Sequence, residues 1–253
     1  MALGALLANR TELFKKQYRL VLIFGAAFVA QLTVVLLVSG TNFYQEFFGT
    51  FGRATGYVAY VALASLLMVA AVTASAFALK RFMHSLLAAG LLSIAYGILQ
   101  ASKLDPIDWV NQYTPVIGFL GNPNFQSAFM GIIGVVSFGM VLKKSYKNST
   151  RIGLGLVGIA SLIVVKETLS TQGYLNFIAG LGVVVILWFF MNKQKVYGLV
   201  ATGLGAFWGL LLFLGLINTG PLASLLNEAS LTARRIYWRT AVKMATDHPF
   251  FGV

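Results

Sequence analysis

The feature that most constrains this chain is a series of apolar runs, each about as long as a helix that crosses a bilayer. Seven such runs occur, at residues 20–38, 57–79, 82–99, 125–142, 152–169, 174–191 and 196–217. The runs are continuously apolar and do not alternate with polar residues, so the pattern favours helices over the strands of a membrane barrel. We therefore expect an all-α, polytopic membrane protein with about seven transmembrane helices.

Composition supports a membrane protein and excludes several kinds of site. Only 10% of the 253 residues are charged, whereas a soluble domain carries roughly 25%. The chain has no cysteine, which excludes disulfides and thiolate metal ligands. A net charge of +12 would indicate nucleic acid in a soluble protein, but here the basic residues follow the predicted topology. We therefore expect no nucleic-acid partner.

The basic residues are distributed unevenly between the two predicted sides of the membrane. If the N-terminus is inside, the inner segments carry 12 Lys and Arg residues and the outer segments carry seven. Four of these seven follow the last apolar run, and each earlier outer loop has one, so the positive-inside rule places the N-terminus in the cytoplasm. The expected organisation is a cytoplasmic segment 1–19, a transmembrane domain 20–217 and an outer segment 218–253.

The outer C-terminal segment contains a basic face. Arg235, Arg239 and Lys243 are spaced i, i+4 and i+8, and Arg234 flanks them. This spacing predicts an amphipathic helix that lies in the outer membrane interface. Two ligands fit such a face. The planar guanidinium groups either hold a polyanion through its phosphate oxygens, or contact the anionic headgroups of the surrounding lipid.

Two polar turns interrupt the apolar runs. Residues 122–124 (Asn-Pro-Asn) precede the fourth run, and residues 170–173 (Ser-Thr-Gln-Gly) separate the fifth from the sixth. Turn chemistry alone accounts for both, with Asn124 as the cap of the next helix and 170–173 as the tip of a helical hairpin. The functional alternative is a polar cluster whose amides bind sugar hydroxyls or phosphate. Lys166 and Glu167 favour this alternative, because ionisable residues at the edge of a span often mark sites.

Several glycines are more simply explained by packing than by ligand binding. The pattern Gly-x-Gly-x-x-Gly at 153–158 lies inside an apolar run with no strand before it, which excludes a dinucleotide site. Gly131, Gly134, Gly205 and Gly209 are predicted to allow close contacts between helices.

Four stretches carry a resemblance to a known family. They are residues 43–56, which end in Gly-Thr-Phe-Gly-Arg-Ala-Thr-Gly; residues 121–128, Gly-Asn-Pro-Asn-Phe-Gln-Ser-Ala; residues 170–173; and residues 233–253, which run from Ala-Arg through Tyr-Trp to Asp-His-Pro-Phe-Phe-Gly-Val. Together they resemble the O-antigen ligase and O-antigen polymerase superfamily of the bacterial cell envelope. The similarity covers most of the chain from about Thr41.

The resemblance implies a glycosyltransferase of the bacterial inner membrane, in lipopolysaccharide or polysaccharide synthesis. Family members transfer a sugar chain from an undecaprenyl-diphosphate carrier to a glycan, lipid or protein acceptor at the outer face. They are expected to need no cofactor and no metal ion, and membrane lipids surround them.

The resemblance also implies roles for individual residues. In the family, arginines hold the diphosphate and a histidine activates the acceptor hydroxyl. The candidate substrate-binding residues here are Arg234, Arg235, Arg239, Arg53, Asn122, Asn124 and Gln172. Gln172 stands where the family often has an arginine, which removes one charge from the diphosphate contacts. The family's histidine motif would lie beyond Val253, so we assign no catalytic base and expect this chain to be the front part of such an enzyme, inactive alone.

Two other classes of function remain open. A transporter of a small anion or an envelope lipid would carry ionisable residues near the middle of its spans. This chain has few such residues there, and its outer charge is concentrated in the last segment. The other class is a non-catalytic scaffold in an envelope-assembly complex.

Overall fold

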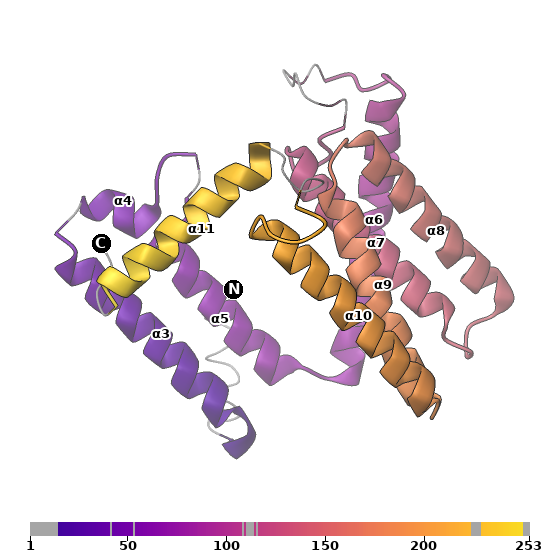
Figure 1. Cartoon of the computed structure of the whole chain (residues 1–253), viewed down its shortest axis with the longest axis horizontal. Coiled ribbons are helices and arrows are strands. Elements are labelled where there is room, and N and C mark those ends of the chain that lie inside the picture. Colours follow the sequence, from indigo (N-terminus) through magenta and orange to yellow (C-terminus); the bar gives the residue numbers. More distant parts are fainter. Residues whose placement is uncertain are drawn as a thin grey trace. The chain divides into compact units, whose positions relative to one another are not determined.

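The computed structural model describes residues 15–40, 42–52, 54–107, 109, 114, 116–223 and 229–249, and for residues 216 and 229–234 the backbone alone. In this part of the chain every regular element is a helix, which confirms the all-α prediction (Figure 1). Six helices are long and apolar enough to cross a membrane: Lys16–Val38, Ala76–Ala101, Pro123–Val141, Asn148–Glu167, Gln172–Met191 and Lys195–Gly215. Such a set is typical of a multi-pass membrane protein.

The remaining predicted run forms a shorter apolar helix, of 17 residues. In chain order the elements are η1 (Lys16–Tyr18), α3 (Arg19–Val38), α4 (Phe43–Phe48), α5 (Tyr57–Thr73), α6 (Ala76–Ala101), α7 (Pro123–Val141), α8 (Asn148–Glu167), α9 (Gln172–Met191), α10 (Lys195–Leu216) and α11 (Ala229–Asp247). At 1.5 Å per residue, α5 is roughly 25 Å long, slightly less than the bilayer core.

The predicted boundary between the second and third runs was wrong. The chain turns at Ala74 and Ser75, and the basic pair Lys80 and Arg81 lies inside α6. Ser75 begins this helix as a cap does, because its Oγ accepts the N–H of Ala78 at 3.1 Å. Lys and Arg are good helix formers, so a basic pair does not by itself end a helix.

The chain folds as two compact units. Unit 1 contains Met1–Leu79 and Leu214–Val253, and unit 2 contains Lys80–Phe213. In unit 2, α7 packs against α6, α8 and α9, and α10 packs against α9 (Figure 1). A glycine lies at each contact: Gly90, Gly158 and Gly180 each face α7, from α6, α8 and α9, and Gly198 of α10 faces α9. Small residues allow apolar helices to approach closely where the hydrophobic effect does not drive them together.

The core of unit 2 lies among α6, α7 and α8. Its buried members are Ile94, Val116, Met130, Ile133, Val164 and Val165. Val116 is the exception among them, because it belongs to the non-helical segment between α6 and α7 and is nevertheless fully buried.

The two ends of unit 2 differ in charge. Consecutive helices run antiparallel, so one end carries Lys80, Arg81, Lys143, Lys144, Lys147, Arg151, Lys193 and Lys195. Arg151 also stabilises the C-terminus of α7 there, because its Nε donates to the carbonyl of Val141 at 2.8 Å. The described residues of the other end include two basic and two acidic side chains, Lys103, Lys166, Asp105 and Glu167, together with both polar turns.

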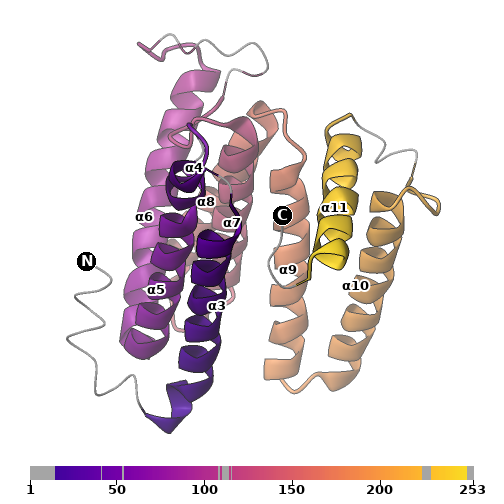
Figure 2. The ribbon, with the colours of Figure 1, turned by 90° about the vertical axis from the view of Figure 1, so that its left-hand side faces the viewer.

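In unit 1, α3 and α5 lie side by side and antiparallel (Figure 2). Thr33 of α3 and Tyr57 of α5 share a hydrogen bond of 3.0 Å between their hydroxyl groups. The segment between α4 and α5 closes into a tight loop, in which Gly49 has φ +90° and a methyl group on it would lie 2.3 Å from the amide nitrogen of Thr55. Only glycine fits at this position of the loop.

Candidate functional site

The predicted basic helix is present. Residues 229–247 form α11 in unit 1, and Arg239 and Lys243 are exposed while Arg235 is half-buried. Large apolar side chains are exposed on the same helix, including Trp238, at 67%, and Val242, at 64%. The helix therefore presents guanidinium groups beside apolar surface. The side chain of Arg234 and all of Arg53 lie outside the described residues, so both stay predictions.

The predicted cap of α7 was wrong by two residues, and the difference matters. Asn122, not Asn124, is the N-cap: its Oδ1 accepts the N–H of Asn124 at 2.9 Å. Pro123 occupies the first helical position, which it favours because it has no N–H to satisfy. A residue before proline takes the extended backbone that an N-cap needs, and Asn122 has φ −148° and ψ 126°. The side chain of Asn124 is therefore available for another contact.

Asn124 joins the two polar turns. Its Oδ1 accepts the hydroxyl proton of Ser170 at 2.9 Å, across 46 residues of sequence. Ser170 Oγ also lies 3.4 Å from the backbone nitrogen of Gln172, the first residue of α9. Of the seven candidate residues, the structure thus brings together Asn122, Asn124 and Gln172.

The N-terminus of α9 is capped by a side chain from α7. Ser127, which is fully buried, accepts the N–H of Gly173 at 2.9 Å and donates its own proton to the carbonyl of Ser170 at 3.1 Å. One helical turn further along α7, a methyl group on Gly131 would lie 2.4 Å from the carbonyl oxygen of Gly173. This close approach confirms the predicted packing role of Gly131, and it sets the N-termini of α7 and α9 beside each other.

Hydrogen bonds fix the segment before α7 against this end of unit 2. Gln100, at the C-terminal end of α6, accepts the N–H groups of Ile117 and Gly118 at 3.1 and 2.8 Å through one side-chain oxygen. The hydroxyl of Thr114 donates to the carbonyl of Glu167 at 3.2 Å. Buried non-helical backbone is stable only when its polar groups have partners, and these hydrogen bonds supply them.

A carboxylate organises the loop that follows α6. Asp105 Oδ2 accepts from Tyr96, Gln100 and Trp109 at 2.9, 3.0 and 3.2 Å, and its Oδ1 accepts the N–H of Ile107 at 3.1 Å. Desolvation raises the pKa of Asp105, but these four hydrogen bonds together outweigh it and hold the pKa below its ordinary value of 3.8. The carboxylate therefore stays ionised and keeps the loop folded against α6.

The structure gives functional candidates that our sequence analysis did not single out. Ser127 lies inside the stretch 121–128 that carries the resemblance, so its position was a usable signal. Gln100 is an amide at the end of an apolar run, which is an expensive place for a polar group unless it has partners. The sequence gives no indication of the role of Asp105 beyond its acidity. That role depends on the hydrogen bonds that Tyr96 and Trp109 donate to it in the folded chain.

Comparison with protein-family models, with curated proteins and with solved structures finds no match for this chain. Two helix N-termini, each with a partial positive charge, and three amide side chains lie together at one end of unit 2. The partial positive charge of a helix N-terminus favours an anion at such a surface.

Proposed function

We propose that this chain is part of a membrane glycan ligase or polymerase. Its reaction is the transfer of a sugar chain from undecaprenyl diphosphate to a glycan, lipid or protein acceptor, at the outer face of the bacterial cytoplasmic membrane. The observation that carries the proposal is the hydrogen bond between Asn124 and Ser170. It joins two of the four stretches on which the family resemblance rests.

The paired N-termini of α7 and α9 suit one phosphate of the donor. The N-terminus of a helix carries roughly half a positive charge and favours anions. Asn122, Asn124 and Gln172 add amide groups that hydrogen-bond to phosphate or sugar oxygens without competing for charge.

The arginines of α11 suit the leaving diphosphate. Negative charge develops on the diphosphate as the glycosidic bond breaks, and fixed guanidinium groups stabilise that charge in a partly dry site. Arg235 and Arg239 are the described candidates, and Arg234 is a third, from its match to the family pattern.

The charge of unit 2 supports the topology that this function requires. Its strongly basic end is the cytoplasmic one by the positive-inside rule. In this proposal α5 is a seventh span, the N-terminus is cytoplasmic, and the polar turns and α11 belong to outer segments. Undecaprenyl-linked glycans would meet the polar turns on that side.

A binding experiment tests the site without requiring catalysis. Asn124→Asp keeps the acceptor oxygen for Ser170 but adds a negative charge beside the two helix N-termini. We expect the purified protein in detergent micelles to bind undecaprenyl diphosphate, and Asn124→Asp to weaken that binding by roughly tenfold or more, through like-charge repulsion. Asn148→Asp, the same change at the first residue of α8 on the basic end, is the matched control. If the wild type does not bind the diphosphate, or if both variants bind it equally well, the site is elsewhere.

A transfer experiment tests the role of α11. In membranes of the source cell, Arg239→Ala should lower glycan transfer by about two orders of magnitude, the size of effect seen when one donor to a developing charge is removed. Arg239→Lys keeps the charge but loses the planar fork, so it should retain part of the activity. Unchanged transfer in Arg239→Ala would exclude this residue from the diphosphate contacts.

A further inference from the structure

A groove between the C-terminal ends of α6 and α8 lies outside the candidate site. It belongs wholly to unit 2 and has a volume of about 310 Å³. Its lining consists of Gly97, Ile98, Ala101, Ser102, Ile163, Val164 and Glu167. The two helices touch beside it, because a methyl group on Gly97 would lie 2.7 Å from Cγ1 of Val164. A close helix–helix contact therefore fixes the walls of this groove.

The groove favours a cation for two reasons. Of the described residues that line it, Glu167 alone is ionisable, and no described residue pairs with its carboxylate. The C-terminus of a helix also carries roughly half a negative charge. α6 and α8 run in the same direction, and Ala101 and Glu167, the last residues of the two helices, both line the groove. The carboxylate and two helix C-termini thus act on one small space.

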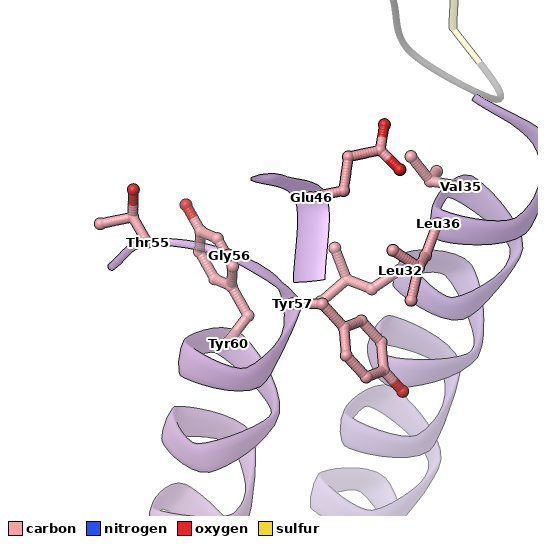
Figure 3. Close-up of a pocket in the computed structure, with 8 residues that line it drawn as sticks. All are labelled: Leu32, Val35, Leu36, Glu46, Thr55, Gly56, Tyr57 and Tyr60. Carbon is pink, nitrogen blue, oxygen red and sulfur yellow. The ribbon is translucent and has the colours of Figure 1, made fainter. Parts of the chain in front are cut away.

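The pocket in unit 1 that also has a carboxylate in its lining is built differently. It lies between the C-terminal end of α3 and the N-terminal end of α5, and Glu46 of α4 lines it (Figure 3). The partial charges of these two helix ends have opposite signs. Glu46 also has an interaction of its own. This pocket therefore lacks the preference for a cation that the groove of unit 2 has.

The walls of the groove between α6 and α8 are apolar and continue into lipid-facing surface. Ile98 is 43% exposed and Ile163 is 52% exposed, and along α8 the exposed surface extends to Ile159 and Leu156, at 52% and 61%. On helices of this composition the exposed surface faces lipid tails. A ligand with a cationic head and apolar chains matches both parts of the groove.

Two lysines add a second charge to the polar end of the groove. Lys103 follows Ser102 in the chain, Lys166 precedes Glu167, and both lysines are exposed. An ammonium group on a flexible stem binds phosphate as a point charge. The polar end therefore has a carboxylate for a cation and lysines for a phosphate, as a zwitterionic headgroup requires.

We propose that this groove binds phosphatidylethanolamine, with its ammonium group at Glu167, its phosphate beside Lys103 and Lys166, and its acyl chains along α6 and α8. A primary ammonium group has three N–H donors, for which the Glu167 carboxylate and the Ser102 hydroxyl are acceptors. The quaternary ammonium group of phosphatidylcholine has no such donor, and phosphatidylglycerol has no cation. The proposal is independent of glycan transfer.

Lipid retention measures this preference directly. The full chain is purified in micelles that contain equal amounts of dioleoyl phosphatidylethanolamine, phosphatidylcholine and phosphatidylglycerol, and the bound lipid is identified by native mass spectrometry. We expect the wild type to retain phosphatidylethanolamine over the other two lipids. Glu167→Gln, which is nearly isosteric, should reduce this preference by about tenfold, because one charge-assisted hydrogen bond is lost.

Two further variants keep the result interpretable. Glu46→Gln makes the same change in the pocket of unit 1 and should keep the wild-type lipid ratio. The thermal unfolding midpoint shows whether Glu167→Gln is folded under the same conditions. If it is not, Ser102→Leu replaces it, since an exposed position tolerates leucine and the larger side chain should block the groove and abolish the preference. The proposal is wrong if the wild type retains the three lipids equally, if a folded Glu167→Gln keeps the wild-type ratio, or if Glu46→Gln reduces the preference as much.

Discussion

The contact between α7 and α9 and the contact between α3 and α5 join apolar helices in different ways. α7 buries seven of its residues, whereas α3 buries none and α5 buries one, Ala64. At the first contact, Gly131 faces a backbone carbonyl, that of Gly173, and at the second Gly25 faces the end of the Met68 side chain.

The two contacts represent two ways in which apolar helices can associate in a bilayer. Lipid tails are as apolar as leucine, so burial of apolar side chains does not drive two helices together there. Close backbone approach and interhelical hydrogen bonds do so instead. The α7–α9 contact has both, through Gly131 and Ser127, and it is also where the candidate site lies. The α3–α5 contact has one hydroxyl pair and leaves room for a pocket.

The largest expected effect comes from a methyl group at the α7–α9 contact. In Gly131→Ala the new carbon would lie 2.4 Å from the carbonyl oxygen of Gly173, and backbone cannot move aside without separating the helices. We expect a loss of about 3 kcal/mol in the free energy of unfolding, the upper part of the range for overpacked cores. Denaturant titration in micelles, followed by circular dichroism, measures it.

The matched change in unit 1 is Gly25→Ala. Its new methyl group would lie 2.3 Å from Cε of Met68, which is the far end of a flexible side chain. Rotation of Met68 relieves this contact, so the expected loss is under about 1 kcal/mol. Equal losses in the two variants would show that the two contacts are equally adaptable, and the proposed difference between them would be wrong.

A smaller effect is expected from buried hydroxyl groups of α7. Ser127→Ala leaves the N–H of Gly173 and the carbonyl of Ser170 without their partner, at a cost of about 2 kcal/mol in the free energy of unfolding. Ser137→Ala is the control, since both serines are fully buried and Ser137 Oγ has no hydrogen-bond partner among the described residues. That control should be neutral or slightly stabilising. A loss as large as that of Ser127→Ala would mean that the hydrogen bonds to α9 contribute little.

Much of the fold could be predicted from the lengths of the apolar runs. A run of about 20 apolar residues has few alternatives to a membrane helix, and the described part of the chain contains six such helices. The turn at Ala74 and Ser75 could not be located, because Lys80 and Arg81 resemble a loop in composition while helices tolerate both. The division into two units depends on which helices pack, and hydropathy alone does not encode that.

The site was predictable in its parts but not in its assembly. Both polar turns were identified, and a helix over the basic segment is confirmed at α11. The meeting of Asn124 with Ser170 was not foreseen, because it requires α7 and α9 to pack in parallel, which depends on Gly131. The sequence offers two candidate caps in Asn-Pro-Asn, and the prediction of Asn124 is wrong because the residue before proline has the extended backbone that an N-cap needs. What Arg235 and Arg239 bind stays a prediction.

The loops of the two units also differ in how their stability should depend on pH. The loop before α5 closes through backbone contact between Gly49 and Gly56, whereas the loop after α6 is organised by the carboxylate of Asp105. The pKa of Asp105 is lower in the folded protein than its ordinary value of 3.8, so its contribution to stability is present above that value and is lost as the pH falls below it.

Trp109 reports on this loop, because its Nε1 donates to Asp105 at 3.2 Å. In a variant that keeps Trp109 as its single tryptophan, we expect the emission to shift toward that of exposed indole as the pH is lowered from 5 through 3.8 and below. Asp105→Asn should remove this transition, since asparagine does not titrate. A tryptophan placed at Phe47, which stacks on Tyr57 beside the loop of unit 1, should show no transition in the same range. A transition that survives in Asp105→Asn would assign the acid sensitivity to another group.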